Sequence, residues 1–395
     1  MSIMEVAVTP DSPFATATPL RETAEQRDLR STVRRFLADT ADLPRVRERM
    51  LQESPHDPEV WKRLAEDLGL VGLAVPERWG GLSASFADQV IVLEEQGRAL
   101  YGGAYLSSAV LAPAALLAVS DDAARDRHLP GIASGETLAT VVGTSAEGEW
   151  SRLDVAASRT AAGWSLTGTA SHVPDGSIAE LLLVVAATSV GPSVFAVRSG
   201  AGVAAEPLPA LDQTRGLAVV RLQEAEGELL GAVGEGTAVL AEVLDRAAVA
   251  VAAEQLGGSA NCLERSVEYL KAREQFGGPI GRFQALKHLC ADMYVGVEAS
   301  RAVVMYAARA FDEDLPDRGA AAAMARSWCS DAYVAAASDT LQMHGGIGYT
   351  WESDVHLYFK RATASALWWG DADASRERLA SLLLDTGPTG TESHA

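Results

Sequence analysis

Two short stretches of this 395-residue chain combine residue types that could hold a ligand carrying a phosphate and a ring. In "REQFGGPIGRFQ", Arg273 could pair with a phosphate, Phe276 could stack on a ring and Gln284 offers an amide. In "QMHGGIGYTWESD", at 342–354, bare backbone lies between two segments that read as helix. Glycine permits a positive φ and a close ligand, and a following helix N-terminus attracts phosphate. Each stretch alone is typical of a helix cap, a turn or a surface arginine, but together they favour a ligand site.

Carboxylates on the helical segment "VLDRAAVAVAAEQLGG" are candidates for acid–base chemistry. Glu254 lies among apolar residues, where burial would raise its pKa. Asp245 precedes it by nine residues, or two and a half helical turns, so the two side chains should not share one face. At most one of them is expected to point toward a bound ligand.

Histidines and cysteines do not indicate a metal site. His344 and His356 are twelve residues apart with no third ligand, which is typical of structural histidines. Three cysteines, at 262, 290 and 329, are scattered singly on helical segments without metal-ligand spacing. We therefore expect no metal and reduced, buried thiols.

The composition is that of an ordinary globular protein, with 48% hydrophobic and 22% charged residues. A formal charge of −20 without a basic stripe argues against nucleic acid as a partner. No apolar run is long enough to span a membrane, and no secretion signal is apparent, so a cytoplasmic location is expected.

The periodicity of apolar residues predicts helices, then strands, then helices again. We expect a disordered N-terminus at 1–22, with Thr23 and Gln26 forming a capping box at the start of the first helix. The predicted regions are a helical domain at 23–137, an antiparallel β domain at 138–232, a helical bundle at 233–386 and a disordered tail at 387–395.

The chain resembles the acyl-CoA dehydrogenase family of flavoproteins over roughly residues 23 to 385. The most specific matches are "REQFGGPIGRFQALKHLCADM" and "LQMHGGIGYTWESDVHLYFKRA", supported by "LAEDLGLVGLAVPERWGG" and "LLGAVGEG". The resemblance implies an α+β fold with an N-terminal α-helical domain, a middle antiparallel β domain and a C-terminal four-helix bundle. It also implies a homodimer or homotetramer, or a heterotetramer with a homologous subunit.

The cofactor implied by the resemblance is FAD bound between subunits. Arg273, Phe276 and Gln284 from one chain would meet it together with three residues from another chain, Gln342, Gly345 and Gly346. The implied reaction removes an α-proton and a β-hydride from an acyl thioester, giving a trans-2-enoyl thioester. A weakly acidic α-proton requires a desolvated carboxylate base. The electrons would pass to an electron-transferring flavoprotein.

The chain departs from the family pattern at the usual base. In most members a glutamate follows the last aromatic stretch, but here "LWWGD" places Trp369 at that position. Some members instead carry the base as a glutamate before an arginine on the first long helix of the bundle. Asp245, before Arg246, is the nearest match and our candidate base, with Glu254 as the rival.

Further departures lie in the β domain, where "GTSAEGEW" and "SHVPD" replace the usual flavin-contacting motifs.

The first functional hypothesis is a dehydrogenase for a bulky or branched acyl thioester, since a base relocated to the helix leaves the pocket with a different shape. The acyl group would be carried by coenzyme A or an acyl carrier protein. A second is a non-catalytic, FAD-binding partner subunit of a heteromeric enzyme. A third, less favoured, is a flavin-dependent oxidase or hydroxylase on the same scaffold.

Overall fold

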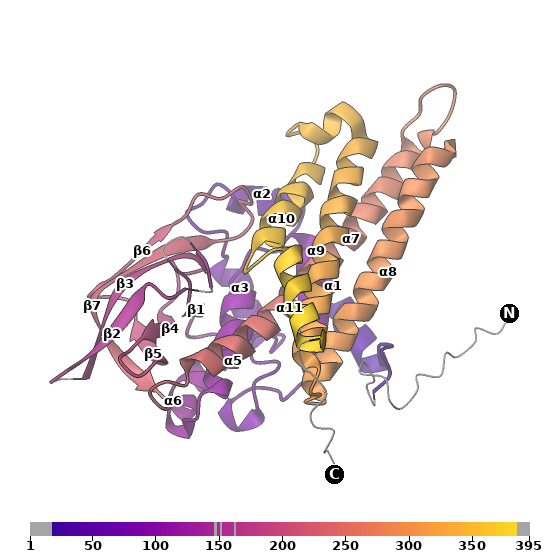
Figure 1. Cartoon of the computed structure of the whole chain (residues 1–395). Coiled ribbons are helices and arrows are strands. Elements are labelled where there is room, and N and C mark those ends of the chain that lie inside the picture. Colours follow the sequence, from indigo (N-terminus) through magenta and orange to yellow (C-terminus); the bar gives the residue numbers. More distant parts are fainter. Residues whose placement is uncertain (1–17, 146–147, 151, 162, 385–395) are drawn as a thin grey trace, which may run out of the picture.

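The computed structural model describes residues 18–145, 148–150, 152–161 and 163–384. Helices come first, a sheet follows, and a second set of helices completes the chain (Figure 1). This order confirms the predicted fold class. Of the ends that we expected to be disordered, residues 1–17 and 387–395 lie outside the described part.

The first helical region packs its apolar faces into one core. Its elements are α1 (Ala24–Thr40), α2 (Leu43–Arg49), α3 (Pro58–Glu66), η1 (Glu77–Trp79), α4 (Phe86–Ala99), η2 (Tyr105–Leu111), α5 (Ala112–Ala118) and α6 (Asp122–Ala133). Helix α1 begins with the predicted capping box, in which the Thr23 hydroxyl accepts a hydrogen bond from the backbone nitrogen of Gln26. Along α1, Val33, Phe36 and Leu37 recur at helical spacing and are buried.

The middle region is one seven-stranded sheet whose pairings form a closed ring. Its strands are β1 (Ala139–Val142), β2 (Val155–Thr160), β3 (Gly163–Pro174), β4 (Leu181–Ala187), β5 (Pro192–Arg198), β6 (Val203–Pro207) and β7 (Leu217–Leu230). The path β4-β2-β3-β7-β5 closes because β5 also pairs with β4. Inside the ring, apolar side chains such as Leu166, Val184 and Phe195 form a core of their own.

The sheet is not wholly antiparallel as we predicted. Strand β1 pairs with β4 in parallel, and the start of β2 pairs in parallel with the end of β4. The reason is topological, since β1 enters from the helical region and its neighbour β4 arrives only after the β2–β3 hairpin. All other pairings of the described strands are antiparallel.

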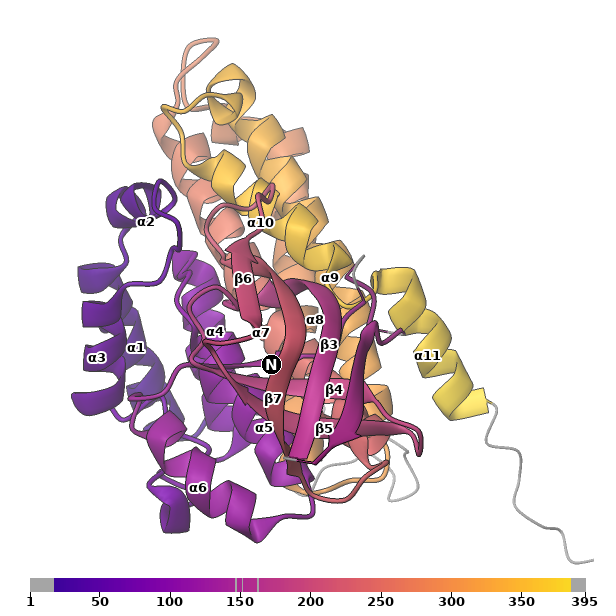
Figure 2. The same ribbon diagram turned by 90° about the vertical axis from the view of Figure 1, so that its left-hand side faces the viewer.

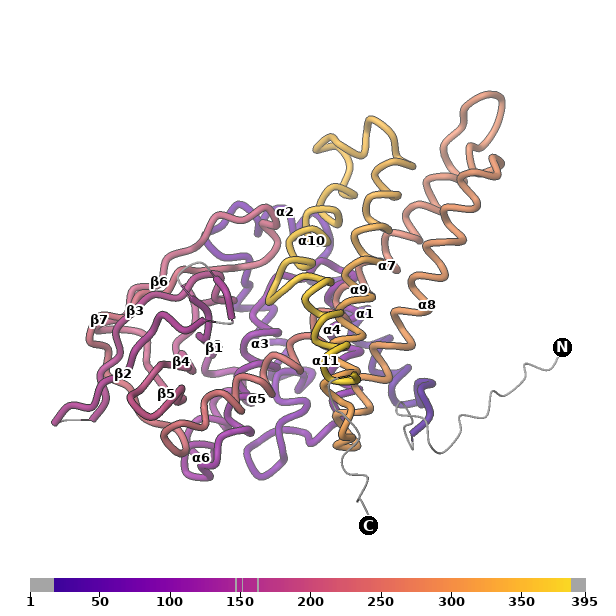
Figure 3. The backbone as a smooth tube through the Cα atoms, in the orientation of Figure 1, coloured from indigo at the N-terminus to yellow at the C-terminus, as the bar shows by residue number. Residues whose placement is uncertain are grey.

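The C-terminal helices form the bundle that the sequence predicted, with one helix added outside it. The bundle consists of α7 (Gly236–Ala272), α8 (Gln284–Asp312), α9 (Arg318–His344) and α10 (Val355–Leu367), and α11 (Ala372–Leu384) packs on α9. Figure 3 shows α7, α8 and α9 as long, side-by-side tubes. In Figure 2 the sheet lies in front of this bundle and α11 lies at its edge.

Two further features bear on the site. Segment η2 is a π-helical turn, which the sequence pattern did not reveal and which other proteins often place at functional sites. No helix in the described ranges is both long enough and apolar enough to cross a membrane.

Candidate functional site

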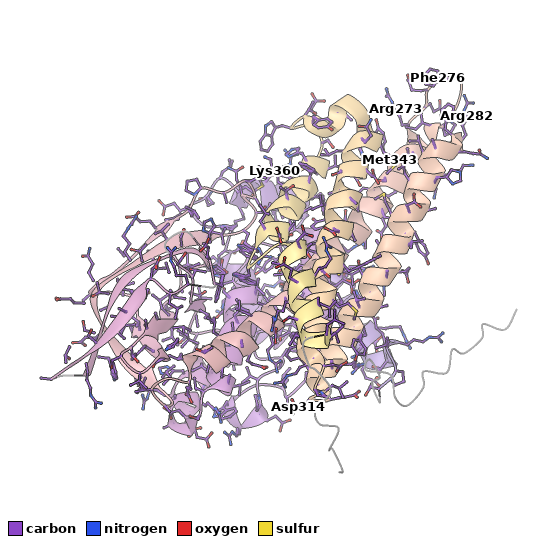
Figure 4. The ribbon with its side chains drawn as sticks, in the orientation of Figure 1. Arg273, Phe276, Arg282, Asp314, Met343 and Lys360 are labelled. Carbon is purple, nitrogen blue, oxygen red and sulfur yellow. The ribbon has the colours of Figure 1, made fainter. Side chains whose placement is uncertain are left out.

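The first ligand-binding stretch forms a narrow hairpin beyond the end of α7. The backbone nitrogen of Ile280 donates to the Arg273 carbonyl at 2.9 Å, and that of Gln275 donates to the Gly278 carbonyl at 3.0 Å. At the turn, Phe276 adopts a positive φ of 55° and is 83% exposed. Figure 4 shows Arg273 and Phe276 at one end of the bundle, with Asp314 at the other. An exposed aromatic ring held at an unfavourable φ indicates a surface that meets another molecule.

The second stretch lies at the same end, where α9 stops and the short helix η4 (Gly345–Tyr349) begins. Gly345 has a φ of +64°, and a Cβ added to it or to Gly346 would meet nothing within 4 Å. Gln342 is exposed one turn earlier. The backbone here is therefore open to a ligand, as the glycine run predicted.

Aromatic stacking joins the two stretches within one chain. The rings of Tyr269, near the end of α7, and His344 stack with centroids 4.2 Å apart, and the Tyr269 hydroxyl donates to the His344 carbonyl at 3.3 Å. Gln284 is the first residue of α8, directly after the hairpin, and its side chain is exposed. We call residues 273–284 and 342–349 the bundle tip. Both sets lie at the same end of the bundle in one chain, and the resemblance implies that two chains share them around the cofactor.

A second candidate site is a cleft of about 400 Å³ between the sheet and α10. Its lining is largely apolar, and one wall consists of Trp368 and Trp369, whose rings stack at 4.9 Å with their planes 10° apart. Trp150 meets Trp369 edge-on at 5.6 Å. Trp369, which the resemblance places at the family's usual base position, is therefore part of an aromatic cluster at the cleft.

Buried charges lie behind this cleft. Arg215, which lines it, forms an ion pair with Glu254 of α7, and both side chains are under a tenth exposed. The Arg215 guanidinium also lies 5.0 Å from the centroid of the Trp368 ring. A second buried pair joins Arg361 of α10 to Asp212, the only carboxylate among the described residues that line the cleft.

A third buried carboxyl group, Asp175, lies at the end of β3 near Arg215. Burial raises the pKa of Asp175 to about 6, although a hydrogen bond from the Ser107 hydroxyl at 2.6 Å opposes the shift. Ser107 belongs to the π-helical turn η2. This turn therefore connects the first helical region to the charges behind the cleft.

The two candidate bases lie on opposite sides of α7, as their nine-residue spacing predicted. Glu254 faces Arg215 and the cleft side. Asp245 forms an ion pair with Arg378 of α11 and lies beside Gly319 at the start of α9. Burial raises the pKa of Asp245, and Arg378 partly offsets that effect.

The histidines behave as structural residues. Nδ1 of His344 donates to the Thr340 carbonyl oxygen at 2.8 Å, and the ring also stacks on Tyr269. His356 packs edge-on against Trp351 at 4.7 Å. Among the described residues, no group of three His, Cys, Asp or Glu side chains could hold a metal ion.

Comparisons with known proteins agree with this architecture. Residues 23–136 match the model for the acyl-CoA dehydrogenase N-terminal domain, and 234–384 match the model for the C-terminal domain. Acyl-CoA dehydrogenase IpdE2 of Mycobacterium tuberculosis is 39% identical over 87% of this chain and 92% of its own length. The chain belongs to the acyl-CoA dehydrogenase family. It is thus an oxidoreductase acting on acyl-CoA.

Solved structures give the same assignment. A chain of the ChsE4-ChsE5 complex from Mycobacterium tuberculosis superposes with a TM-score of 0.86 at 30% identity, over 94% of this chain and all of that one. A chain from a variant of the Tcur3481-Tcur3483 steroid ACAD gives 0.83 at 32% identity, over 91% and 98% of the two chains. Acyl-CoA dehydrogenases of this kind are flavoproteins.

The bundle tip fits such a cofactor in two respects. Arg273 forms no ion pair with any described residue, so its guanidinium is free for an anion, and the glycine backbone at 345–346 is uncovered. The sequence pattern pointed to these tip residues, and it gave no role to Arg215, Arg361 or Trp150 at the cleft. A usable signal was the cluster "LDQTR", which places charges of both signs inside an otherwise apolar, strand-forming region.

Proposed function

We propose that this acyl-CoA dehydrogenase uses FAD to convert an acyl thioester to its trans-2-enoyl thioester and passes the electrons to an electron-transferring flavoprotein. The observation that most supports FAD is the bundle tip. Arg273, which forms no ion pair with a described residue, lies at the same end of the bundle as an exposed ring and bare glycine backbone (Figure 4). A chain in the solved structure of the electron transferring flavoprotein of Acidaminococcus fermentans shares this fold at 25% identity. The curated relatives supply the acyl-CoA chemistry.

Each tip residue has a separate task in this proposal. Arg273 would pair with the diphosphate, Phe276 would pack on a ring, and Gln284 and Gln342 would donate or accept through their amides. The backbone at Gly345 and Gly346 would approach the cofactor closely because no side chain intervenes. When bound, FAD supplies the acceptor for the hydride that leaves the β-carbon.

For the α-proton we propose a carboxylate on α7, either Asp245 as the sequence suggested or Glu254. The position of Glu254 supports it as the stronger candidate, because its partner Arg215 lines the cleft. Asp245 has a pKa raised by burial, which suits a base, but its side chain is directed toward α9 and α11. The tryptophan wall would exclude water from the cleft and so strengthen the basicity of Glu254, whose partner lines it.

Anaerobic flavin bleaching tests the main proposal. The purified protein should be yellow with FAD, and a series of straight, branched and ring-bearing acyl-CoA thioesters should include one that bleaches it. A correctly folded preparation that neither contains nor takes up FAD would exclude the proposal for this chain alone. Oxygen consumption without an added electron acceptor would instead indicate an oxidase.

Paired amide variants then identify the base. Glu254→Gln and Asp245→Asn both keep the shape of the side chain but cannot accept a proton. With a substrate that the parent accepts, we expect stopped-flow flavin reduction to be lost in Glu254→Gln and retained in Asp245→Asn. Loss only in Asp245→Asn returns the role to Asp245, and loss in neither excludes both.

The cleft itself favours a second candidate, a non-catalytic partner subunit. Trp369 stands at the usual base position, and the only described carboxylate lining the cleft, Asp212, is held by Arg361. The ChsE4-ChsE5 structure is itself a complex of two differently named chains, and its fold is of this type. If FAD binds only after a homologous chain is added, and that chain's base is the one required, this second function holds.

A further inference from the structure

Arg326, on the inner side of α9, is a buried cation whose partners are almost all backbone carbonyls. It is 3% exposed, and burial lowers its pKa to about 10. No carboxylate forms an ion pair with it anywhere in the described ranges. A buried guanidinium is costly unless its hydrogen bonds are satisfied, so its acceptors show what it is there to hold.

The acceptors are gathered at the end of α10 and in the turn that follows it. Nitrogen Nη2 of Arg326 lies 2.6 Å from the Ser365 carbonyl and 2.7 Å from that of Trp368. The carbonyls of Ala366 and Gly370 are each 3.4 Å away. Carbonyls at a helix C-terminus lack partners within the helix and carry its negative dipole end. The guanidinium therefore caps α10 from a neighbouring helix.

The turn that Arg326 holds is strained. Trp369 has a φ of +56°, a conformation that is a rare outlier for a bulky residue, and Gly370 follows at +101°. A backbone of this kind persists only where its surroundings fix it. From this turn the Trp369 ring lies flat against Trp368 and edge-on to Trp150.

We propose that Arg326 is the positioning residue for the aromatic wall of the cleft. Its side chain never reaches the cleft and acts through the turn at 368–370, whose conformation it sets. The opposite nitrogen, Nη1, donates to the Ser330 hydroxyl. The single hydrogen of that hydroxyl is shared between the Arg326 carbonyl at 2.8 Å and Oε1 of Gln255, on α7, at 3.3 Å. The tryptophan wall is thus tied through α9 to α7. This inference concerns the cleft alone and does not depend on which function the chain performs.

Circular dichroism of the stacked tryptophans provides a direct readout. Two indoles stacked 4.9 Å apart couple their transitions, and an in-plane rotation of one ring relative to the other gives a paired positive and negative band in the far ultraviolet. Trp368→Phe removes the stacked pair but keeps the Trp150–Trp369 contact, so the part of the band that this variant loses belongs to the stacked pair. In Arg326→Met, of similar length but without donors, we expect at least half of the amplitude to be lost while the helical signal and a cooperative unfolding transition remain.

Two further variants separate positioning from general support. Arg326→Lys keeps the charge but brings one nitrogen in place of a planar fork, so an intermediate amplitude is expected. Ser330→Ala removes the partner of Nη1 only and should leave the band unchanged, as the matched control. A folded Arg326→Met with full amplitude would overturn the proposal, and so would loss of the band in Ser330→Ala alone.

If Arg326→Met does not fold, Arg326→Gln replaces it, because its shorter amide stays polar but cannot reach all four carbonyls. Full amplitude in that folded variant would overturn the proposal, and reduced amplitude would support it. If neither Arg326→Met nor Arg326→Gln folds, the band amplitude of Arg326→Lys provides the test. Full amplitude with a single ammonium nitrogen would show that the guanidinium fork is not required, whereas reduced amplitude would support the assignment.

Discussion

The two candidate bases on α7, Glu254 and Asp245, differ mainly in how exposed their arginine partners are to solvent. Glu254 and Arg215 are both under a tenth exposed, whereas Arg378, the partner of Asp245, is 41% exposed. A charge in the interior depends on its partner far more than one at the surface does, because solvent cannot replace the lost contact. The same substitution should therefore have unequal effects at the two positions.

We expect Glu254→Gln to lower the free energy of unfolding by about 3 kcal/mol, since it leaves the Arg215 charge buried without its counter-ion. Asp245→Asn should change stability by about 1 kcal/mol or less, because burial already disfavours the charged form of Asp245 and solvent screens Arg378. Urea unfolding of the two variants checks this difference. Equal losses would contradict the contrast in burial.

At the bundle tip, Arg273→Ala should weaken FAD retention by one to two decades, because a charged hydrogen bond to phosphate contributes about 1.5–3 kcal/mol. Dimer dissociation should become easier in parallel, since the resemblance implies a cofactor shared between subunits. Arg376→Ala on α11, where an exposed arginine pairs with Asp331 and Asp373, is the matched control. Equilibrium dialysis of FAD and analytical ultracentrifugation measure both effects, and unchanged retention would show that Arg273 does not hold the cofactor.

At the residue level, the sequence is most informative where a short motif fixes the local backbone. The glycine run and the "REQFGG" stretch lie at the bundle tip because their backbone demands are local. The Arg215–Glu254 and Arg361–Asp212 pairs could not be found this way, since their members are 39 and 149 residues apart. Only the packing of α7 and α10 against the loop before β7 brings them together.

At the level of elements, the capping box of α1 links three helices. The Gln26 amide that completes the box also donates to Asp88 at 2.8 Å, and its oxygen accepts from Arg309 of α8 at 3.2 Å. Thr23→Ala should therefore cost about 1 kcal/mol of unfolding free energy. Ser31→Ala, at an exposed position of the same helix, should stay within about 0.5 kcal/mol of the parent in thermal unfolding. A Thr23 variant as stable as the Ser31 control would contradict the role of the cap.

The contact between η2 and β3 should make stability depend on pH. The folded pKa of Asp175, about 6, lies above its ordinary value of 3.8, so the native state binds this proton more tightly than the unfolded state does. The resulting stabilisation is present below pH 3.8 and is lost as the pH rises through 6. Between pH 5 and 7 the loss should be about 1 kcal/mol.

Asp175→Asn removes this dependence, so its unfolding free energy relative to the parent should rise by about 1 kcal/mol from pH 5 to 7. Chemical denaturation at several pH values measures the difference. The exposed substitution Asp67→Asn should show no such trend. A constant difference between Asp175→Asn and the parent would mean that Asp175 titrates normally in the folded chain.

Element boundaries were largely predictable, because apolar periodicity, glycine and proline mark them. The breaks near Gly277–Pro279, Pro316 and Gly345–Gly348 fall where α7, α8 and α9 end. The parallel pairing of β1 with β4 and the π-helical turn were not predictable. Both depend on which segments of the chain pack against one another in the fold. Neither is marked by a periodic pattern of apolar residues in the local sequence.

At the scale of the whole molecule, helix α7 runs from the charged residues behind the cleft to the bundle tip. Glu254 is on α7 and Arg273 directly follows its last residue, so the 19 positions between them correspond to about 29 Å along the helix axis. The sheet covers the cleft end, while the tip projects beyond the other helices (Figure 1). A tip exposed in this way is suited to meet a second chain, which agrees with the oligomeric neighbours of this fold.

Because α7 is one continuous helix, two positions near its ends are held at a fixed distance within each chain. Thr237 and Lys271 are exposed near its two ends and differ by 34 positions, so spin labels on them would stand about 51 Å apart in any single chain. Pulsed electron resonance on the doubly labelled protein should give this distance with a narrow spread. Any shorter distance in the same trace would have to join two chains, and diluting the sample with unlabelled protein should remove it. The helix thus allows subunit contacts to be counted without knowing in advance where they lie.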